Sequence, residues 1–158
     1  MLKHVGFHNW RGNFWPSLNQ LKPYFIAPRG REWFYTARVD DAIISLEGVE
    51  GTEHLGFSKG RKDICLWMWG NPDHGVLLMY EKIGAKDHFE TKFSKGDMSR
   101  IGEWVRTLQD DLRPIGLYVP FAKAWPAVKE FMETEGQLPG CIEWIDCHDL
   151  PPNTFPDP

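Results

Sequence analysis

The sequence predicts an α+β fold: an antiparallel sheet meander of about five to six strands, with a C-terminal helix and a short N-terminal helix packed on one face. Four short β-rich runs separated by turn residues predict strands at residues 63–69, 75–82, 88–93 and 103–108. An apolar stripe at helical spacing predicts the C-terminal helix. The length of 158 residues, with 42% hydrophobic residues, suits one domain with its own core.

The N-terminal part of the chain carries less regular signals. Residues 1–30 are rich in aromatic residues, Gly and Pro, which predicts an irregular lead segment held against the domain by its rings. A strand is expected at residues 32–39. Asp40 then stands at the N-cap position of a predicted short helix that ends near Gly48. The apolar residues of this helix are Ile43, Ile44 and Leu46.

The strand around Trp67 is apolar on both faces. One face carries Ile64, Leu66 and Met68, and the other carries Cys65, Trp67 and Trp69. A strand of this kind is expected at the centre of the sheet, with a helix covering one face. Residues 70–75 and 83–87 contain turn-forming residues and predict the hairpin loops on either side of the next strand.

The C-terminal helix is predicted from a stripe that consists of Phe121, Trp125, Val128 and Met132. Pro126 is tolerated in a first helical turn, so the helix is expected to begin near Ala122 and to end at Gly136.

A final strand is predicted at residues 141–146, with Ile142 and Trp144 on one face. Residues 149–158 form a Pro-rich tail in which polyproline structure or disorder is expected. The segment between the lead and the tail, residues 31–148, is expected to be a single domain.

Composition limits the possible partners and compartments. The formal net charge of -4 disfavours nucleic acid as a direct partner, because phosphate binding needs a basic surface. The N-terminus lacks the apolar core of a signal peptide, and no stretch is apolar enough to span a membrane, so a cytoplasmic protein is expected. Three cysteines at irregular spacing predict buried, reduced thiols and no disulfide.

No group of residues forms a recognisable catalytic centre. His88 and Glu90, taken with Cys141 and Cys147, faintly resemble the ligand and acid pattern of zinc deaminases. The two cysteines are six residues apart across a predicted strand, whereas the zinc pattern needs them about one helical turn apart. We therefore predict no catalytic residue, no metal ligand and no cofactor.

Two alternatives remain open at this stage. One is a metal-dependent hydrolase built around Asp87, His88 and Glu90. The other is a module that binds a small molecule or scaffold in an aromatic pocket around Trp67 and Trp69.

The C-terminal third resembles a known family. Its residues 119–121, 124–131, 133–139 and 142–144 follow in the order of the closing signature of immunity protein family one, from bacterial polymorphic toxin systems. The hairpin at residues 66–80 is similar to the central hairpin of that family, so the resemblance covers roughly residues 33–146. This chain departs from the pattern by an extra Glu135 and by Gly140 after Pro139.

The resemblance implies a protein that binds one cognate toxin domain in a 1:1 complex and blocks its active site. Toxins beside such proteins are commonly nucleic-acid deaminases, and nucleases also occur. A basic toxin would meet exposed acidic groups and aromatic anchors. The toxin-binding residues predicted on this reasoning are Trp67, Trp69, Asp73, His74, Tyr80, Asp87, Phe89, Glu90, Asp110 and Asp111.

Overall fold

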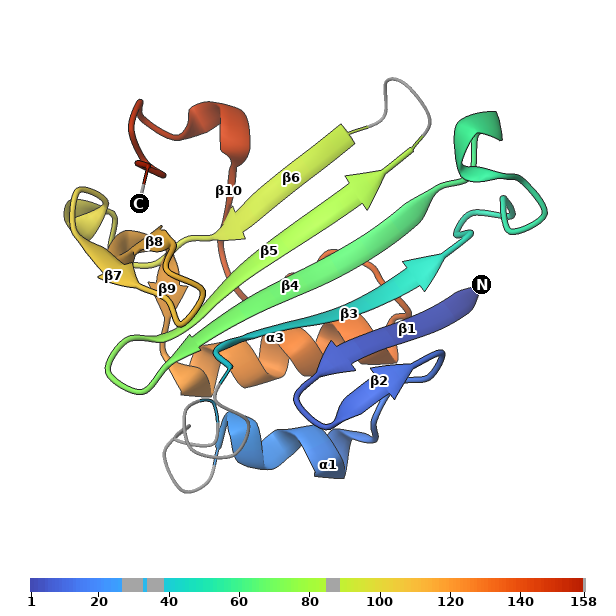
Figure 1. The fold of residues 1–158 in the computed structure, drawn as a ribbon, viewed down its shortest axis with the longest axis horizontal. Coiled ribbons are helices and arrows are strands. Elements are labelled where there is room, and N and C mark those ends of the chain that lie inside the picture. Colours follow the sequence, from blue (N-terminus) through green and yellow to red (C-terminus); the bar gives the residue numbers. More distant parts are fainter. Residues whose placement is uncertain (27–32, 34–38, 85–88, 158) are drawn as a thin grey trace.

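A large antiparallel sheet dominates the computed structural model, which describes residues 1–26, 33, 39–84 and 89–157 (Figure 1). The strands are β1 (Leu2–Phe7), β2 (Trp10–Gly12), β3 (Asp41–Glu47), β4 (Asp63–Asn71), β5 (Gly75–Ile83), β6 (Phe89–Ser94), β7 (Trp104–Arg106), β8 (Leu112–Pro114), β9 (Tyr118–Val119) and β10 (Trp144–Asp146). The α-helices are α1 (Leu18–Leu21) and α3 (Phe121–Glu133). Short 3-10 helices are η1 (Lys22–Tyr24), η2 (Phe57–Lys59), η3 (Met98–Arg100), η4 (Ile115–Leu117) and η5 (Cys147–Asp149).

The large sheet has the strand order β10-β6-β5-β4-β3-β1-β2, and β9 pairs with the end of β5. Its centre, β3 to β6, is a meander in which each strand pairs with the next in the sequence. The pairing of β4 with β5 and of β5 with β6 confirms the corresponding part of the predicted meander. The sheet has eight strands rather than five to six. The additional strands come from the N-terminal segment and from short pieces near the C-terminus, which carry little local β signal.

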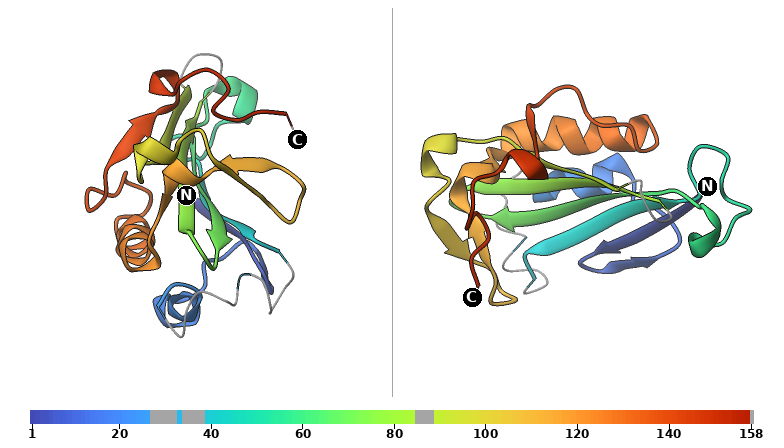
Figure 2. Two further views of the ribbon diagram at one scale, coloured as in Figure 1. Left: turned by 90° about the vertical axis from the view of Figure 1, so that its left-hand side faces the viewer. Right: turned by 90° about the horizontal axis from the view of Figure 1, so that it is seen from above.

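Helices α1 and α3 lie on one face of the sheet, as predicted (Figure 2). Helix α3 begins at Phe121, with Pro120 at its N-cap, and buries Trp125 and Val128. Pro126 lies in its second turn rather than its first. The helix is terminated at Gly136, whose φ of 97° is the left-handed conformation that glycine favours and whose amide donates to the Phe131 carbonyl.

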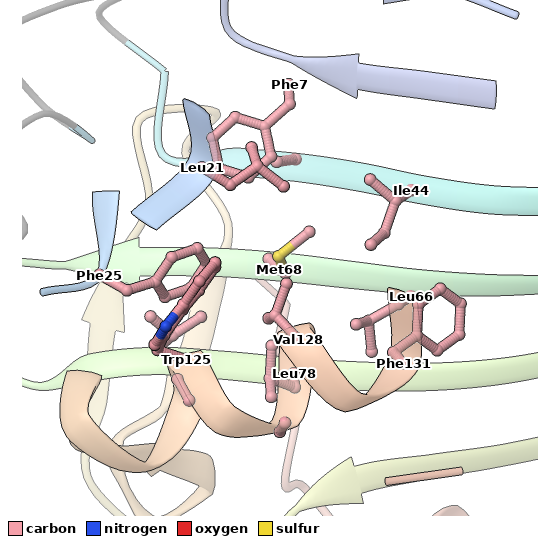
Figure 3. Close-up of a cluster of buried hydrophobic side chains, with 14 of the residues drawn as sticks. Phe7, Leu21, Phe25, Ile44, Leu66, Met68, Leu78, Trp125, Val128 and Phe131 are labelled. Carbon is pink, nitrogen blue, oxygen red and sulfur yellow. The ribbon is translucent and has the colours of Figure 1, made fainter. Parts of the chain in front are cut away.

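The main core fills the space between the helices and the sheet (Figure 3). Leu66 and Met68 from β4 and Leu78 from β5 point toward α3, and all three are fully buried. The fully buried side chains that surround them include Phe7, Leu21, Phe25, Ile44, Val128 and Phe131. The predicted covering of one face of β4 by a helix is therefore confirmed.

The prediction of a short helix from Asp40 to Gly48 was wrong, because residues 41–47 form strand β3. Burial alternates strictly along this segment, and Ala42, Ile44 and Leu46 are the buried residues. A spacing of two belongs to a strand with one covered face. The N-terminal helix is α1 instead, and its N-cap Ser17 forms a capping box with Gln20.

Residues 1–30 were expected to be irregular, yet their described part contains β1, β2 and α1. Strand β1 pairs with β3, with Val5 opposite Ile44. This pairing joins residues about 40 positions apart, so a local reading of the sequence misses it. The rings of this segment do pack on the core, as predicted: Phe7 and Phe25 are fully buried. The strand predicted at 32–39 falls almost wholly outside the described residues.

The C-terminal half differs from the prediction in four places. The run at residues 103–108 contributes β7 to a separate two-stranded sheet with β8, and the final strand is limited to residues 144–146. The tail is ordered against the domain: Trp104 donates its indole N–H to the Thr154 carbonyl at 2.9 Å, and Phe155 packs on Phe93 with ring centroids 5.1 Å apart. Cys141 is exposed rather than buried.

Among the described residues, no helix combines the length and the apolar character needed to cross a bilayer.

Candidate partner-binding surface

Among the described residues, no α-helix lies over the sheet face opposite α3, and we call this face the open face (Figure 2). Its middle row consists of Ile43, Trp67 and Met79, which lie directly opposite one another on β3, β4 and β5. All three side chains are half-buried, although their neighbours on the other face are fully buried. An apolar row that keeps part of its surface in water is a candidate contact surface.

One end of the open face is closed by the β7–β8 hairpin and the C-terminal tail, which project from the side opposite α3 (Figure 2). A second, smaller core lies beneath them and includes Trp69, Leu77 and Phe93. The Arg113 guanidinium lies 4.2 Å from the Trp69 ring centroid and 5.7 Å from that of Phe155. Arg113, in the hairpin, therefore contacts both the sheet and the tail.

Three hollows lie along the open face. The first has a volume of about 490 Å³ and is lined by β5, β6 and the tail, including Met79, Glu81 and Phe155. The second, about 180 Å³, lies between β1, β3 and β4 beside Trp67. The third, about 220 Å³, is lined by residues on both sides of Cys65. A surface hollowed in this way can receive protruding side chains.

Several acidic side chains lie on the open face. Glu47 and Asp63 share the guanidinium of Arg61, whereas Asp41 and Glu81 have no ion-pair partner within the described residues. Cys65 lies among these acids, and burial, followed by the charges of Glu81 and Asp63, raises its thiol pKa to about 12. The thiol is therefore protonated at neutral pH and is a poor nucleophile.

The two predicted tryptophans lie together at the centre of the surface. Their rings stack with centroids 6.3 Å apart and planes inclined by 17°. Trp67 is half-buried, and its indole N–H has no partner within the described residues, whereas Trp69 is buried beneath Arg113. Trp67 lines the neighbouring hollow, and Trp69 is not among the residues that line it.

The predicted acidic loop residues lie at one end of the molecule. Asp110 and Asp111 occupy the turn of the β7–β8 hairpin, where Asp110 adopts a φ of 69° and pairs with Arg106 at 2.9 Å. Asp73 is exposed in the β4–β5 turn, and the half-buried His74 next to it lies 6.3 Å from the Tyr118 ring centroid. These four residues remain available to a partner at the hairpin end.

Two other predicted residues, Tyr80 and Glu90, belong to the opposite face of the sheet. Tyr80 is buried on the helix-covered face, where its hydroxyl donates to the Gly136 carbonyl at 2.9 Å and burial raises its pKa to about 12. Glu90 belongs to the same face by register and lies 3.8 Å from the Lys92 ammonium. Asp87 and His88 fall outside the described residues, and for Phe89 only the backbone in β6 is described.

Sequence reasoning missed Ile43, Met79, Glu81 and Thr91 as members of the open face. The alternation along β5 was available as a signal, because it places Met79 and Glu81 on the side of Trp67. Ile43 was missed because its strand was taken for a helix.

Potential metal ligands cluster at one place in the described part of the chain. The ligand atoms of Asp146, Cys147 and His148 lie within 4.8 Å of one another. Asp146 caps η5 by accepting the His148 amide at 2.9 Å, which accounts for the proximity of consecutive residues. Burial and the neighbouring Asp146 raise the pKa of the Cys147 thiol, so the ligating thiolate is disfavoured.

Comparison with known proteins gives one positive result. No curated protein and no solved structure matches this chain significantly. The family model of immunity protein Imm1 matches residues 104–146, which run from β7 to β10 and include α3. Such a match supports an immunity protein that acts against a toxin and suggests an inhibitor rather than an enzyme. Residues 104–146 thus carry the Imm1 immunity protein signature, which confirms the resemblance seen in the sequence.

Proposed function

We propose that this chain is an immunity protein that binds a cognate toxin domain in a 1:1 complex and covers its active site, and that the toxin is a nucleic-acid deaminase. The observation that carries the proposal is the Imm1 match over residues 104–146. The matched segment forms the hairpin at the end of the open face as well as the helix that supports the sheet from behind.

The contact surface we propose is the open face together with the hairpin end. Its half-buried apolar row supplies area that loses water on binding, with Trp67 as the central aromatic anchor. Asp73, Asp110 and Asp111 lie at the hairpin end of this surface, and their acidic charge suits the basic cleft of a nucleic-acid enzyme. Inhibition then requires only tight steric coverage, and no bond in the toxin or its substrate has to be broken.

The proposed function is tested with the toxin domain encoded by the reading frame next to this chain's own. The purified toxin domain should deaminate bases of a nucleic acid, and one equivalent of this chain should abolish the activity. Co-expression should rescue bacterial growth. A toxin domain that cleaves nucleic acid instead would overturn the deaminase assignment but not the immunity role. Failure of an active toxin domain to bind would overturn the immunity role itself.

The position of the surface is tested with a matched pair of charge reversals. Asp111→Lys changes a half-exposed carboxylate at the hairpin, and Glu133→Lys makes the same change on α3, behind the sheet. We expect Asp111→Lys to weaken toxin binding by about tenfold or more and Glu133→Lys to leave it nearly unchanged. Equal effects of the two substitutions, measured by titration calorimetry, would contradict the proposed surface.

A further inference from the structure

One hollow of the open face lies where β5 and β6 meet the C-terminal tail. Its volume is about 490 Å³. Met79, Phe93, Leu150 and Phe155 form its apolar walls, and Glu81 and Thr91 contribute polar groups. The sides of the hollow are half-exposed at Leu150 and Phe155, so a side chain that protrudes from another protein can enter from solvent.

The two polar groups of this hollow lack partners. The Glu81 carboxylate makes neither an ion pair nor a hydrogen bond with any described residue, whereas Glu47 and Asp63 on the same face are paired with Arg61. Thr91 lies opposite Glu81 in the β5–β6 register, is only 6% exposed, and its hydroxyl oxygen has no partner in the described part of the chain. A buried hydroxyl without a partner costs free energy that a bound donor would recover.

One wall residue, Phe155, already lies near a guanidinium. Arg113 lies over the Trp69 ring and 5.7 Å from the Phe155 ring centroid. Phe155 and Phe93 lie together in the wall, with centroids 5.1 Å apart and planes inclined by 39°. Rings arranged in this way attract a cation through their faces. The methylene groups of a long basic side chain would lie against Met79 and Leu150.

The geometry points to this hollow as the receptor for an arginine side chain of the partner toxin, with the guanidinium bound to Glu81 and Thr91 and the stem held between Met79, Phe93 and Phe155. This inference rests on the proposed function, because it identifies the group that the toxin inserts into the open face.

Arginine fits the donor and acceptor pattern better than other side chains do. Its planar guanidinium carries five N–H donors in a fixed fork, so it can bind a carboxylate and a hydroxyl oxygen at once while stacking on aromatic rings. A neutral side chain would leave the Glu81 charge unpaired beneath the interface, where desolvation makes an unpaired charge costly. A toxin that binds nucleic acid presents such basic side chains around its active site.

The first experiment compares Glu81→Gln with Glu133→Gln in binding to the toxin domain. Glu81→Gln removes the charge but keeps the size, and Glu133→Gln makes the same change on α3. We expect Glu81→Gln to weaken binding by at least about 30-fold and Glu133→Gln to change it by less than about twofold. Glu81 has no partner among the described residues, so its variant should unfold at the wild-type temperature. Unchanged binding of Glu81→Gln would overturn the inference.

The second experiment needs no toxin. N-acetyl-arginine methylamide is titrated into the ¹³C-methyl-labelled chain and compared with N-acetyl-citrulline methylamide, its neutral isostere. We expect the arginine probe to shift the methyl resonances of Met79 and Thr91, the citrulline probe to leave them in place, and Glu81→Gln to abolish the effect. Equal shifts with both probes, or shifts that persist in Glu81→Gln, would overturn the inference.

The two experiments separate the inference from the proposed function. If the toxin domain binds the wild type and Glu81→Gln equally well, the arginine receptor is wrong and the immunity role stands. If the wild type does not bind the toxin domain but the arginine probe still depends on Glu81, the immunity role is wrong and the chemistry of the hollow stands.

Discussion

Two buried ionisable side chains stand out at the scale of single residues, and both lie at the ends of strands near the open face. His8 adopts a φ of 51° directly after β1, and its ring is surrounded by Phe7, Tyr24 and Trp33. Neither ring nitrogen of His8 has a hydrogen-bond partner within the described residues. Asp40 precedes β3 and is 4% exposed. Both side chains should make the stability of the protein depend on pH, but in opposite directions.

Burial lowers the pKa of His8 from its ordinary 6.5 to about 4. Between these values the unfolded chain binds the proton and the folded chain does not, so the folded state loses stability as the pH falls. The loss between pH 7 and pH 5 should be about 2 kcal/mol. Urea unfolding at the two pH values checks this in the wild type and in His8→Phe, which should lack that loss. A variant with the full wild-type pH dependence would show that another group is responsible.

Asp40 fastens the β7–β8 turn to the sheet, because its carboxylate accepts the Leu108 amide at 3.0 Å. We expect Asp40→Ala to lower the free energy of unfolding by about 1–3 kcal/mol, since it leaves that amide without its acceptor. Asp40→Asn keeps an acceptor and removes a buried charge, so it should be at least as stable as the wild type at pH 7.

The pH dependence of this pair follows from the raised pKa of Asp40, which is caused mainly by burial. Because the carboxyl pKa is raised by folding, the folded chain binds a proton at a higher pH than the unfolded chain does. Lowering the pH therefore raises the free energy of unfolding of the wild type relative to that of Asp40→Asn, which has no carboxyl group at this position. The difference in the free energy of unfolding between Asp40→Asn and the wild type, measured by urea unfolding, should therefore become smaller as the pH falls. Equal stability of Asp40→Ala and Asp40→Asn would contradict the role of the Leu108 hydrogen bond.

At the scale of a single element, helix α3 contains a residue that destabilises it, Pro126. Pro126 lies in its second turn and is exposed, and a proline there cannot donate to the Ala122 carbonyl. We expect Pro126→Ala to raise the free energy of unfolding by about 2 kcal/mol, because it restores a helical hydrogen bond and a better helix former. Thermal unfolding measures the gain. Toxin binding should be unchanged, since Pro126 is on the far side of the helix from the open face. If Pro126→Ala instead unfolds at a lower temperature than the wild type, the proline ring stabilises the helix by packing.

Several elements could be predicted from local sequence and others could not. Strands β4 and β5 and helix α3 carry strong periodic signals of 9, 9 and 13 residues, and these elements were predicted within a few residues. Strands β1, β2, β9 and β10 are short and are stabilised by pairing with distant strands. Gly75 illustrates this dependence, because a side chain there would meet the Val119 carbonyl 2.0 Å away, a contact that only the folded chain creates.

The whole molecule is a sheet supported on one face by helices and left open on the other, with an acidic net charge of -4. If the open face meets a basic toxin, the charges should accelerate encounter at low salt. We expect the association rate constant to fall by about tenfold between 50 and 500 mM NaCl, with a smaller change in the dissociation rate constant. Stopped-flow fluorescence of the tryptophans checks this, and a salt-independent association rate would exclude electrostatic steering.

The candidate site could be predicted only in part. Trp67, Asp110 and Asp111 were predicted from residue type, and the structure leaves all three accessible on the open side. Tyr80 was also predicted but faces the core, because successive residues of β5 point to opposite faces and its neighbour Met79 lies on the open face. The hollow at Glu81 depends on a tail that was expected to be disordered, so no local pattern could indicate it.

The sequence by itself determined the fold class, the central meander, helix α3 and the Imm1 signature, because each of these depends on periodicity or on residue order within a short stretch. The tertiary structure alone decided which face of the sheet stays open, where the N-terminal strands join, and that Glu81, Thr91 and Phe155 line one hollow. The physical reason is that burial and partnership are properties of contacts between distant segments, and the sequence near a residue does not specify which distant segment will cover it.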